Sequence, residues 1–312
     1  MTDNTGGFIY RTPRFDFISK FKNKYPAIIC PGFYILHWAA GCLGECSYCW
    51  LKGTMTRYFS VLKNHRHLQE KPKLVLCTNI GLMEKQIERM VLNKKTPFVL
   101  NAGELADSFC GMDKKTLDSI LRPFNLLKDT PHKILFVTKF DPFVALQIEP
   151  TLLDNAIFSF SLSPFSKYER GTEPWKERIQ SAKALDRPVR LRLDPLIPEF
   201  GWMPGYRELV EEILKPPTLQ IERVTLGRLR FFPVVKSTMT DKAKLLEFAP
   251  KRRPEDKRFV LPDEDFLKMA GYIITLFPLG TQFALCKEPE YIWKKFQVYG
   301  LDYKNPKCNC VL

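Results

Sequence analysis

The 312-residue chain is 45% hydrophobic and 26% charged, the balance of an ordinary globular protein, and its length allows one large domain or two small ones. It has no apolar run near the length of a membrane span and starts with a polar, mixed segment instead of a signal peptide, so we expect a soluble, cytoplasmic protein without membrane contact. Its net charge of +14 favours a polyanionic partner, nucleic acid first, although such a charge can also serve solubility alone.

Short β-rich runs alternate with helix-like runs along the chain. The β-rich runs occupy residues 73–79, 97–103, 133–140, 156–163, 188–198 and 222–232. The helix-like runs occupy residues 81–93, 113–127, 173–185, 204–215 and 262–276. This alternation predicts βαβ units around a parallel sheet. About six units without an obvious reversal favour an α/β barrel, complete or partial, and a doubly wound sheet is the alternative.

Polar side chains fall on one face of three predicted strands. The three sets are Ser159, Ser161 and Ser163; Arg190, Arg192 and Asp194; and Arg228 and Arg230. An ordinary closed barrel fills its interior with apolar layers, so a polar interior face predicts a polar ligand inside the barrel. The alternative is that one side of these strands faces solvent.

A basic segment, residues 249–262, contains three prolines and five cationic residues. These are Lys251, Arg252, Arg253, Lys257 and Arg258. We expect an exposed basic loop, which serves either as a polyanion contact or as a solvated connector.

The stretch GCLGECSYCW places Cys42, Cys46 and Cys49 within eight positions. A structural zinc site needs four ligands, and no histidine stands at a finger spacing, although a catalytic zinc with three protein ligands stays open. A four-iron cluster held by three thiolates fits better, because it leaves one iron free to bind a substrate or cofactor. Gly41 and Gly44 allow the loop to wrap tightly around such a cluster.

The C-x3-C-x2-C spacing is that of the radical S-adenosylmethionine (SAM) enzymes. Together with KILFVTKF, FSFSLSPFSKYERGTEPWKERIQSAKAL and PLIPEFGWMPGYRELVEEI, the cysteine stretch resembles the spore photoproduct lyase family, over about residues 30 to 230. The resemblance implies a partial (β/α)6 barrel of the radical SAM type with a short cysteine-containing C-terminal tail. We expect an N-terminal extension over residues 1–30, the barrel over 31–285 and the tail over 286–312.

The resemblance also implies two cofactors, a 4Fe-4S cluster and SAM, whose reductive cleavage gives a 5′-deoxyadenosyl radical. Cys42, Cys46 and Cys49 match the cluster ligands, and Tyr48 matches an aromatic residue near the adenine. Lys139 and Ser161 match residues at the SAM carboxylate. Gly103 and Glu104 resemble the stretch that receives the SAM amino group, although Glu104 can also be a helix N-terminal acid.

The sequence departs from the family pattern at two positions. Glu104 stands near the place of a hydrogen-donor cysteine, and Trp50 replaces a tyrosine after the last cluster cysteine. The final hydrogen donor is therefore open. We take Glu104, Asp107 and Cys110 as candidate catalytic residues.

Further cysteines gather near the C-terminal end of the sequence. Cys286, Cys308 and Cys310 predict a second metal or iron–sulfur site, or a tail that folds back to cap the barrel; thiols without a ligand are the alternative. Cys30 and Cys77 are expected to be buried core thiols.

The leading hypothesis is a radical SAM enzyme, lyase-like, that acts on nucleic acid in repair or modification, with Arg192, Arg228 and Arg230 holding phosphates. We expect a monomer that takes electrons from a flavodoxin or ferredoxin. Two alternatives stand beside it: a radical SAM enzyme for a small molecule or peptide, and a non-catalytic iron–sulfur protein.

Overall fold

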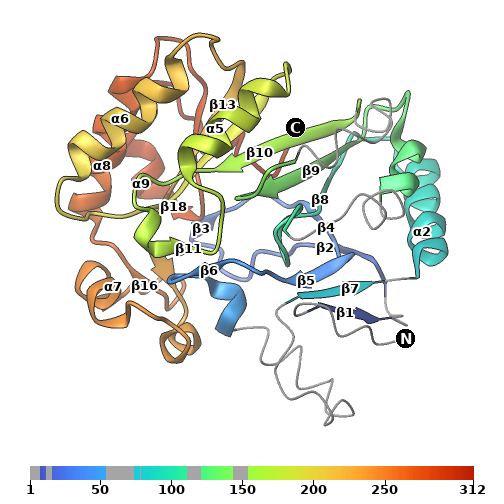
Figure 1. Cartoon of the computed structure of the whole chain (residues 1–312), viewed down its shortest axis with the longest axis horizontal. Coiled ribbons are helices and arrows are strands. Elements are labelled where there is room, and N and C mark those ends of the chain that lie inside the picture. Colours follow the sequence, from blue (N-terminus) through green and yellow to red (C-terminus); the bar gives the residue numbers. More distant parts are fainter. Residues whose placement is uncertain (1–7, 12–15, 54–73, 78, 111–120, 143–153) are drawn as a thin grey trace.

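The computed structural model describes residues 8–11, 16–53, 74–77, 79–110, 121–142 and 154–312. An eight-stranded sheet in the order β17-β13-β12-β10-β9-β8-β4-β2 forms its centre (Figure 1). Its strands, in chain order, are β2 Ile18–Lys20, β4 Tyr34–Leu36, β8 Val99–Asn101, β9 Lys133–Thr138, β10 Ala156–Ser161, β12 Val189–Leu196, β13 Ile221–Arg228 and β17 Phe283–Leu285. All neighbours from β4 to β17 pair in parallel, and β2 pairs antiparallel to β4 at the edge.

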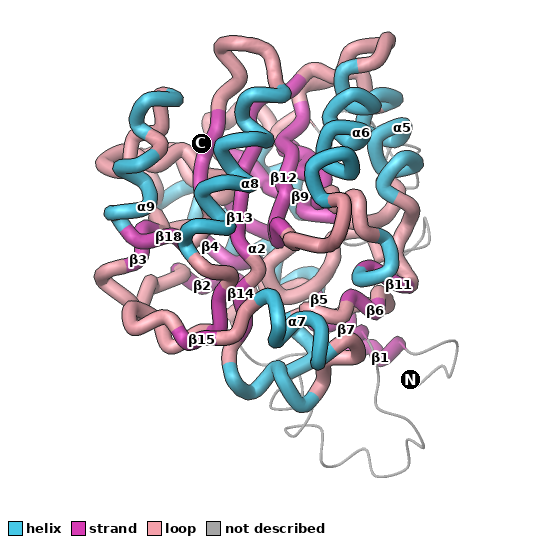
Figure 2. Tube along the Cα trace, turned by 90° about the vertical axis from the view of Figure 1, so that its left-hand side faces the viewer, coloured by secondary structure: helices cyan, strands magenta, loops and turns pink. Residues whose placement is uncertain are grey.

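The strand order decides between the two predicted architectures. From β4 to β17 the spatial order follows the chain without the reversal that defines a doubly wound sheet, so the prediction of a partial parallel α/β barrel is confirmed. Helices lie on the outside of the strands (Figure 2). They are α2 Ile80–Asn93, α5 Trp175–Ala184, α6 Trp202–Leu214, α7 Lys242–Phe248, α8 Asp263–Leu276 and α9 Glu290–Lys295, with 3-10 turns at η1 Arg122–Leu127, η3 Ser166–Tyr168, η4 Pro233–Ser237 and η5 Gln297–Tyr299.

Several short strands form small sheets around the barrel. One sheet contains β1 Phe8–Arg11, β7 Leu74–Cys77 and β5 Ala39–Gly41, and another contains β14 Arg230–Phe231, β16 Phe259–Val260 and β15 Lys251–Arg252. Two further sheets have two strands each: β6 Glu45–Cys46 with β11 Glu169–Arg170, and β3 Ile28–Ile29 with β18 Glu288–Pro289. The first barrel strand is therefore β4, and the predicted strand 73–79 belongs outside the barrel. The run 73–79 is strongly apolar, whereas β4 spans too few residues for its period to stand out.

Two other predicted elements differ from the structure. The run 222–232 divides into β13 and β14, which belong to different sheets. The predicted helix 113–127 lies partly outside the described residues, and its described end is the 3-10 turn η1. The remaining predicted helices agree with α2, α5, α6 and α8 to within a few residues.

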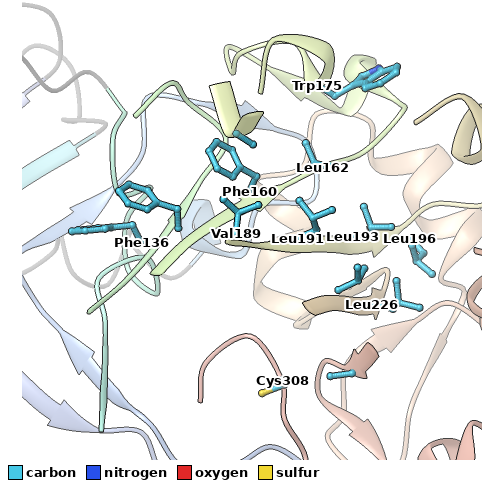
Figure 3. Packing of buried hydrophobic residues seen from close by; sticks show 14 of the residues in the cluster. Phe136, Phe160, Leu162, Trp175, Val189, Leu191, Leu193, Leu196, Leu226 and Cys308 are labelled. Carbon is cyan, nitrogen blue, oxygen red and sulfur yellow. The ribbon is translucent and has the colours of Figure 1, made fainter. Parts of the chain in front are cut away.

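The core lies between the strands and the outer helices. Phe158 and Phe160 of β10 are fully buried, and Phe158 packs on Phe136 of β9 with ring centroids 5.7 Å apart. Figure 3 shows Phe136 and Phe160 in this core. Leu191 and Leu193 of β12 are buried on the same side. Because side chains alternate along a strand, this apolar outer face leaves the serines and arginines between these positions pointing inward.

The C-terminal segment returns into the barrel and binds part of this inward face. Arg190 donates to the carbonyls of Asn309 and Val311, both at 2.6 Å. Arg223 donates to the carbonyl of Cys308 at 3.2 Å, and the Ser159 hydroxyl donates to Asn309 Oδ1 at 2.8 Å. Figure 3 shows Cys308 on this returning segment. The alternative of a tail that folds back to cap the barrel therefore agrees with the structure.

The predicted domain boundaries at residues 30/31 and 285/286 stay predictions. Strand β2 supplies an edge strand to the barrel sheet, and residues 308–311 bind inside it, so both flanking segments contact the barrel. Across the described ranges, no helix has the length and apolarity needed to cross a membrane.

Two glycines give a matched test of this packing. A Cβ atom on Gly103, which follows β8, would lie 2.5 Å from the Val137 Cβ and 2.9 Å from its backbone nitrogen, whereas one on Gly81 of α2 meets nothing within 4 Å. We expect Gly103→Ala to lower the free energy of unfolding by about 1–3 kcal/mol. Gly81→Ala should raise it by up to about 1 kcal/mol. Urea unfolding of both variants measures this, and equal effects would contradict the close approach of β8 and β9.

Candidate active site

The cysteine loop is positioned by the two glycines within it. Gly41, with a positive φ of 100°, donates its N–H to the carbonyl of Leu105 at 2.8 Å and so joins the loop to the segment after β8. The Gly44 N–H donates to Cys42 Sγ at 3.3 Å. A Cβ on Gly44 would lie 2.9 Å from Thr172 Cγ2, so a larger residue there would displace the loop.

The three thiols of this loop lie close enough to influence one another's charge. Burial raises the pKa of Cys46 and of Cys49, and Cys42 contributes to both shifts. The pKa of Cys42 is raised first by a hydrogen bond with the Cys110 thiol and then by burial. The three thiols are therefore protonated in the absence of metal, and metal binding must displace their protons.

The donor set fits an iron–sulfur cluster better than a single ion. In the described part of the chain, no three His, Cys, Asp or Glu side chains converge on one metal position. In a four-iron cluster each thiolate binds a different iron, so the ligands stand further apart than around one zinc ion. A loop with thiol donors alone and a backbone N–H directed at a sulfur matches that requirement.

Lys139 and Ser161 come together at the carboxyl ends of β9 and β10. Lys139 Nζ donates to Ser161 Oγ at 2.7 Å and to Glu169 Oε1 at 2.6 Å. The Lys139 side chain keeps 16% of its surface exposed, whereas Glu169 is fully buried. Two residues that the sequence placed at one carboxylate site are thus in direct contact.

Glu169 links this pair to the cysteine loop. Its carboxylate accepts a hydrogen bond from Arg178 Nη2 at 2.6 Å and another from the Tyr48 hydroxyl. Its backbone pairs with Cys46 across the antiparallel strands β11 and β6. Burial raises the pKa of Glu169, but Lys139 and Arg178 outweigh that effect and lower it to about 2. Glu169 is therefore an anion at neutral pH.

The candidate catalytic residues Asp107 and Cys110 lie beside these groups. The Asp107 carboxylate accepts hydrogen bonds from the backbone of Lys139 at 2.7 Å, from the Thr138 hydroxyl at 2.8 Å and from the backbone of Phe109 at 3.0 Å. Burial raises its pKa despite these bonds. Asp107 thus fixes the end of β9, and Cys110 is fully buried against Cys42.

Glu104 and Gly103 follow β8 on the way into the barrel. The Gly103 N–H donates to Asn101 Oδ1 at 2.9 Å. Glu104 forms a long ion pair of 3.7 Å with Lys287, which comes from the segment after β17. Lys287 holds its backbone at φ 56°, a region that residues other than glycine rarely adopt.

Two of the predicted substrate arginines meet inside the barrel. Arg192 pairs with Asp194 at 2.6 Å, and Arg230 forms two bonds of 2.9 Å to the same carboxylate. A Cβ on Gly227 would lie 2.4 Å from Asp194 Oδ1, so glycine leaves the space that this pairing fills. Arg192 and Arg230 are partly exposed, so their guanidinium groups can reach a bound molecule.

The third predicted arginine, Arg228, does not belong to this group. It is fully buried on the outer side of β13, where it pairs with Glu288 at 2.6 Å and with Asp263 of α8. Side chains alternate along β13, so positions 223, 225 and 227 point inward and Arg228 points outward. The strand ends at Arg228, so this alternation does not continue to Arg230. We therefore remove Arg228 from the candidate substrate residues.

The basic segment 249–262 is exposed only in part. Lys251, Arg252 and Lys257 are exposed, as expected. Arg253 is buried and pairs with Asp256 at 2.6 Å and Glu288 at 3.0 Å. Arg253 therefore holds this segment to the barrel instead of contacting a partner.

Sequence reasoning missed Glu169 and Arg178. Both lie within the stretch FSFSLSPFSKYERGTEPWKER that carries the resemblance, but an acid in the two-residue strand β11 has no periodic signature. The one available signal was charge balance: a lysine at a strand end inside a barrel requires a buried anion nearby.

The chain is similar to known proteins over most of its length. Residues 20–257 match the family model described as spore photoproduct lyase. The spore photoproduct lyase of Bacillus subtilis (strain 168) is 25% identical over 188 residues, which cover 58% of this chain and 50% of the relative. That of Geobacillus sp. (strain Y412MC61) is 23% identical over 205 residues, 64% and 54% of the two chains. The chain spans about half the length of these curated relatives.

Solved structures agree with the fold. A spore photoproduct lyase complexed with dinucleoside spore photoproduct superposes with a TM-score of 0.63 at 20% identity, covering 89% of this chain and 82% of the other. A mutant of such a lyase with bound AdoMet and dinucleoside spore photoproduct gives 0.63 at 21% identity, covering 88% and 81%. At these identities the likeness establishes the fold alone.

Glu169 gives a pH-dependent test of the site. We expect Glu169→Gln to lower the free energy of unfolding at pH 7 by about 3–5 kcal/mol, because Lys139 and Arg178 lose their buried counter-ion. A carboxyl group with a lowered folded-state pKa stabilises the fold above its unfolded value of 4.5 and loses that contribution as the pH falls towards about 2.

Urea unfolding of both proteins between pH 7 and pH 3 measures this difference, which should narrow below about pH 4.5. Glu208→Gln, at an exposed pair with Lys176, is the control and should cost no more than about 1 kcal/mol. A difference that stays constant across this range would show that Glu169 is not ionised in the fold.

Proposed function

Since the chain belongs to the spore photoproduct lyase family, we propose that it is a radical SAM enzyme that abstracts hydrogen from a nucleic acid in a lyase-like repair or modification reaction. The observation that carries this proposal is the bonded group Lys139–Ser161–Glu169, joined through β11 and β6 to the backbone of Cys46. This connection supports a SAM site beside the proposed cluster loop.

Cys42, Cys46 and Cys49 are the proposed ligands of a 4Fe-4S cluster. When bound, the cluster supplies an open iron and the electron that cleaves SAM to methionine and a 5′-deoxyadenosyl radical. A flavodoxin or ferredoxin is the proposed electron donor. One chain contains all of the groups named, so we propose a monomer.

Lys139 is proposed to bind the SAM carboxylate. An ammonium group has three donors, and Ser161 and Glu169 take two of them, which leaves one for a carboxylate. Tyr48 is proposed to contact the adenine, and the hydrogen bond from its hydroxyl to Glu169, which fixes the ring, supports this role. The 5.8 Å from Lys139 Nζ to the Tyr48 ring centre keeps both groups at one site.

The SAM amino group is assigned to the segment after β8. Gly103 has no side chain, and a Cβ at this position would lie 2.5 Å from the Val137 Cβ, so only glycine fits here. Glu104 supplies the anion, and its present ion pair with Lys287 is long enough for a closer ammonium to compete with it. Glu104 thus has a defined role without acting as a hydrogen-atom donor.

The substrate class follows from charge and from the related proteins. The net charge is +14, and Lys251 and Arg252 form an exposed cationic strand, β15. Arg192 and Arg230 offer guanidinium groups inside the barrel, so a base must leave its stack to reach them. Related lyases are described with dinucleoside spore photoproduct, which supports a nucleic-acid lesion as the substrate class.

Formation of 5′-deoxyadenosine tests the radical chemistry. After anaerobic reconstitution with iron and sulfide, the wild type should convert SAM to 5′-deoxyadenosine in the presence of dithionite, and Cys46→Ala should not. Ser161→Ala should weaken SAM binding about tenfold, since one hydrogen bond that orients Lys139 is lost. Cys77→Ala, on a different sheet, is the control and should keep full activity.

A reconstituted wild type that binds iron but produces no 5′-deoxyadenosine would favour the non-catalytic iron–sulfur protein. Turnover stimulated by a metabolite extract and not by DNA or RNA would favour the small-molecule enzyme.

Oligonucleotide binding tests the substrate class separately. We expect affinity for a single-stranded oligonucleotide to fall linearly with the logarithm of salt concentration. Lys251→Glu/Arg252→Glu should weaken binding at low salt by about tenfold or more, because two phosphate contacts are lost. The control, Lys85→Glu/Lys95→Glu at and just after α2, lies on the opposite side of the molecule and should bind as the wild type does (Figure 1). No binding at low salt would contradict a nucleic-acid substrate.

A further inference from the structure

Four cysteines from three separate segments meet inside the barrel. Cys286 follows β17, Cys308 and Cys310 lie on the returning tail, and Cys30 follows β3. Antiparallel pairing of β3 with β18 sets Ile29 opposite Glu288, so the next residues along, Cys30 and Lys287, face each other. Cys30, expected to be a buried core thiol, is therefore half-buried beside Cys286.

The thiols of this group contact polar side chains of the barrel interior. Arg230 Nη2 donates to Cys286 Sγ at 3.1 Å, and Arg192 Nη2 lies 3.7 Å from the same sulfur. Asn101 of β8 donates to Cys310 Sγ at 3.7 Å. The Cys308 and Cys310 thiols are hydrogen-bonded to each other, and both Cys286 and Cys310 lie within electrostatic range of Cys30.

These surroundings are unlike those of a structural core thiol. A buried free cysteine normally packs as a small apolar group, whereas this group lies among the cations Arg192, Arg230 and Lys287 and near Arg223. Burial raises the pKa of the Cys286 thiol and the neighbouring cations lower it only in part, so metal binding must displace its proton. All nine cysteines of the chain are free, so no disulfide competes for these sulfurs.

The four thiols do not form a ready site for a single metal ion. Within the described ranges no three of these side chains converge on one ion position, and the same holds for the cysteine loop at Cys42. Zinc needs all four sulfurs at about 2.3 Å from one point, whereas an iron–sulfur cluster spreads its thiolate ligands over several irons.

We propose that Cys30, Cys286, Cys308 and Cys310 bind a second iron–sulfur cluster inside the barrel, separate from the cysteine loop. Four thiolates complete its ligand set, so it has no open iron and is not a second SAM site. Two of its ligands are in the tail, so the cluster also fixes residues 308–311 against Arg190 and Arg223. The proposed cluster shares Arg192 and Arg230 with the proposed substrate site, but its test measures iron content and needs no turnover of SAM or nucleic acid.

The test is iron and sulfide content after anaerobic reconstitution of the full chain with iron(II) and sulfide. The wild type should contain about eight irons per chain if the second cluster has four irons, or about six if it has two. The triple variant Cys42→Ala/Cys46→Ala/Cys49→Ala should keep this second portion. Cys286→Ser/Cys310→Ser should lose it and keep about four irons.

Cys77→Ala is the matched control and should leave the iron content unchanged. If the double variant does not fold, Cys30→Ser, which lies outside the tail, repeats the test. Electron paramagnetic resonance of the reduced triple variant identifies the second cluster directly. A folded triple variant that binds no iron would overturn the proposal. About one zinc ion per chain in that variant would also overturn it, because it would show a mononuclear site.

Discussion

The buried carboxylate of Glu169 holds the two halves of the candidate active site together. It binds Lys139 from the end of β9, Arg178 from α5 and Tyr48 from the cysteine loop, and its backbone pairs with Cys46. A buried charge is tolerated only when it is paired, so these four segments can adopt only arrangements that keep all three partners in place.

This group also carries an excess of one positive charge. Lys139 and Arg178 together bear two charges, and Glu169 neutralises one of them. A second anion at Lys139 would complete the balance, which is the electrostatic reason that a carboxylate ligand suits this place. The burial of Glu169 thus explains both the rigidity of the site and its preference for an anionic molecule.

Alternation along the strands divides the barrel interior into levels. The innermost positions, Ser159, Arg190 and Arg223, bind the returning tail. Two residues further along β12, Arg192 lies beside Cys286, and Ser161 of β10, which is paired with Arg192 in the sheet register, meets Lys139. A step of two residues therefore separates the side chains that bind the tail from the level at which Arg192 and Ser161 stand.

The sequence was sufficient for the barrel and the cysteine loop, because these depend on periodicity and on local spacing, whereas the contact of Lys139 with Ser161 was implied only by the family resemblance. It was insufficient for β4, which is too short to have a period, and for Arg228, whose face changes where β13 ends. Glu169 and the position of Cys30 depend on pairings between distant segments, which no local pattern records.

The tail inside the barrel has a consequence for the order of folding. Arg190 donates a hydrogen bond to a carbonyl 119 positions later in the chain. Until residues 308–311 have been synthesised, the guanidinium groups of Arg190 and Arg223 lack the tail carbonyls that accept their hydrogen bonds. A nascent chain in which every barrel strand has been synthesised therefore still lacks the tail, and the guanidinium groups of Arg190 and Arg223 lie inside the barrel without it. Contacts between segments this far apart in the chain slow the final step of folding.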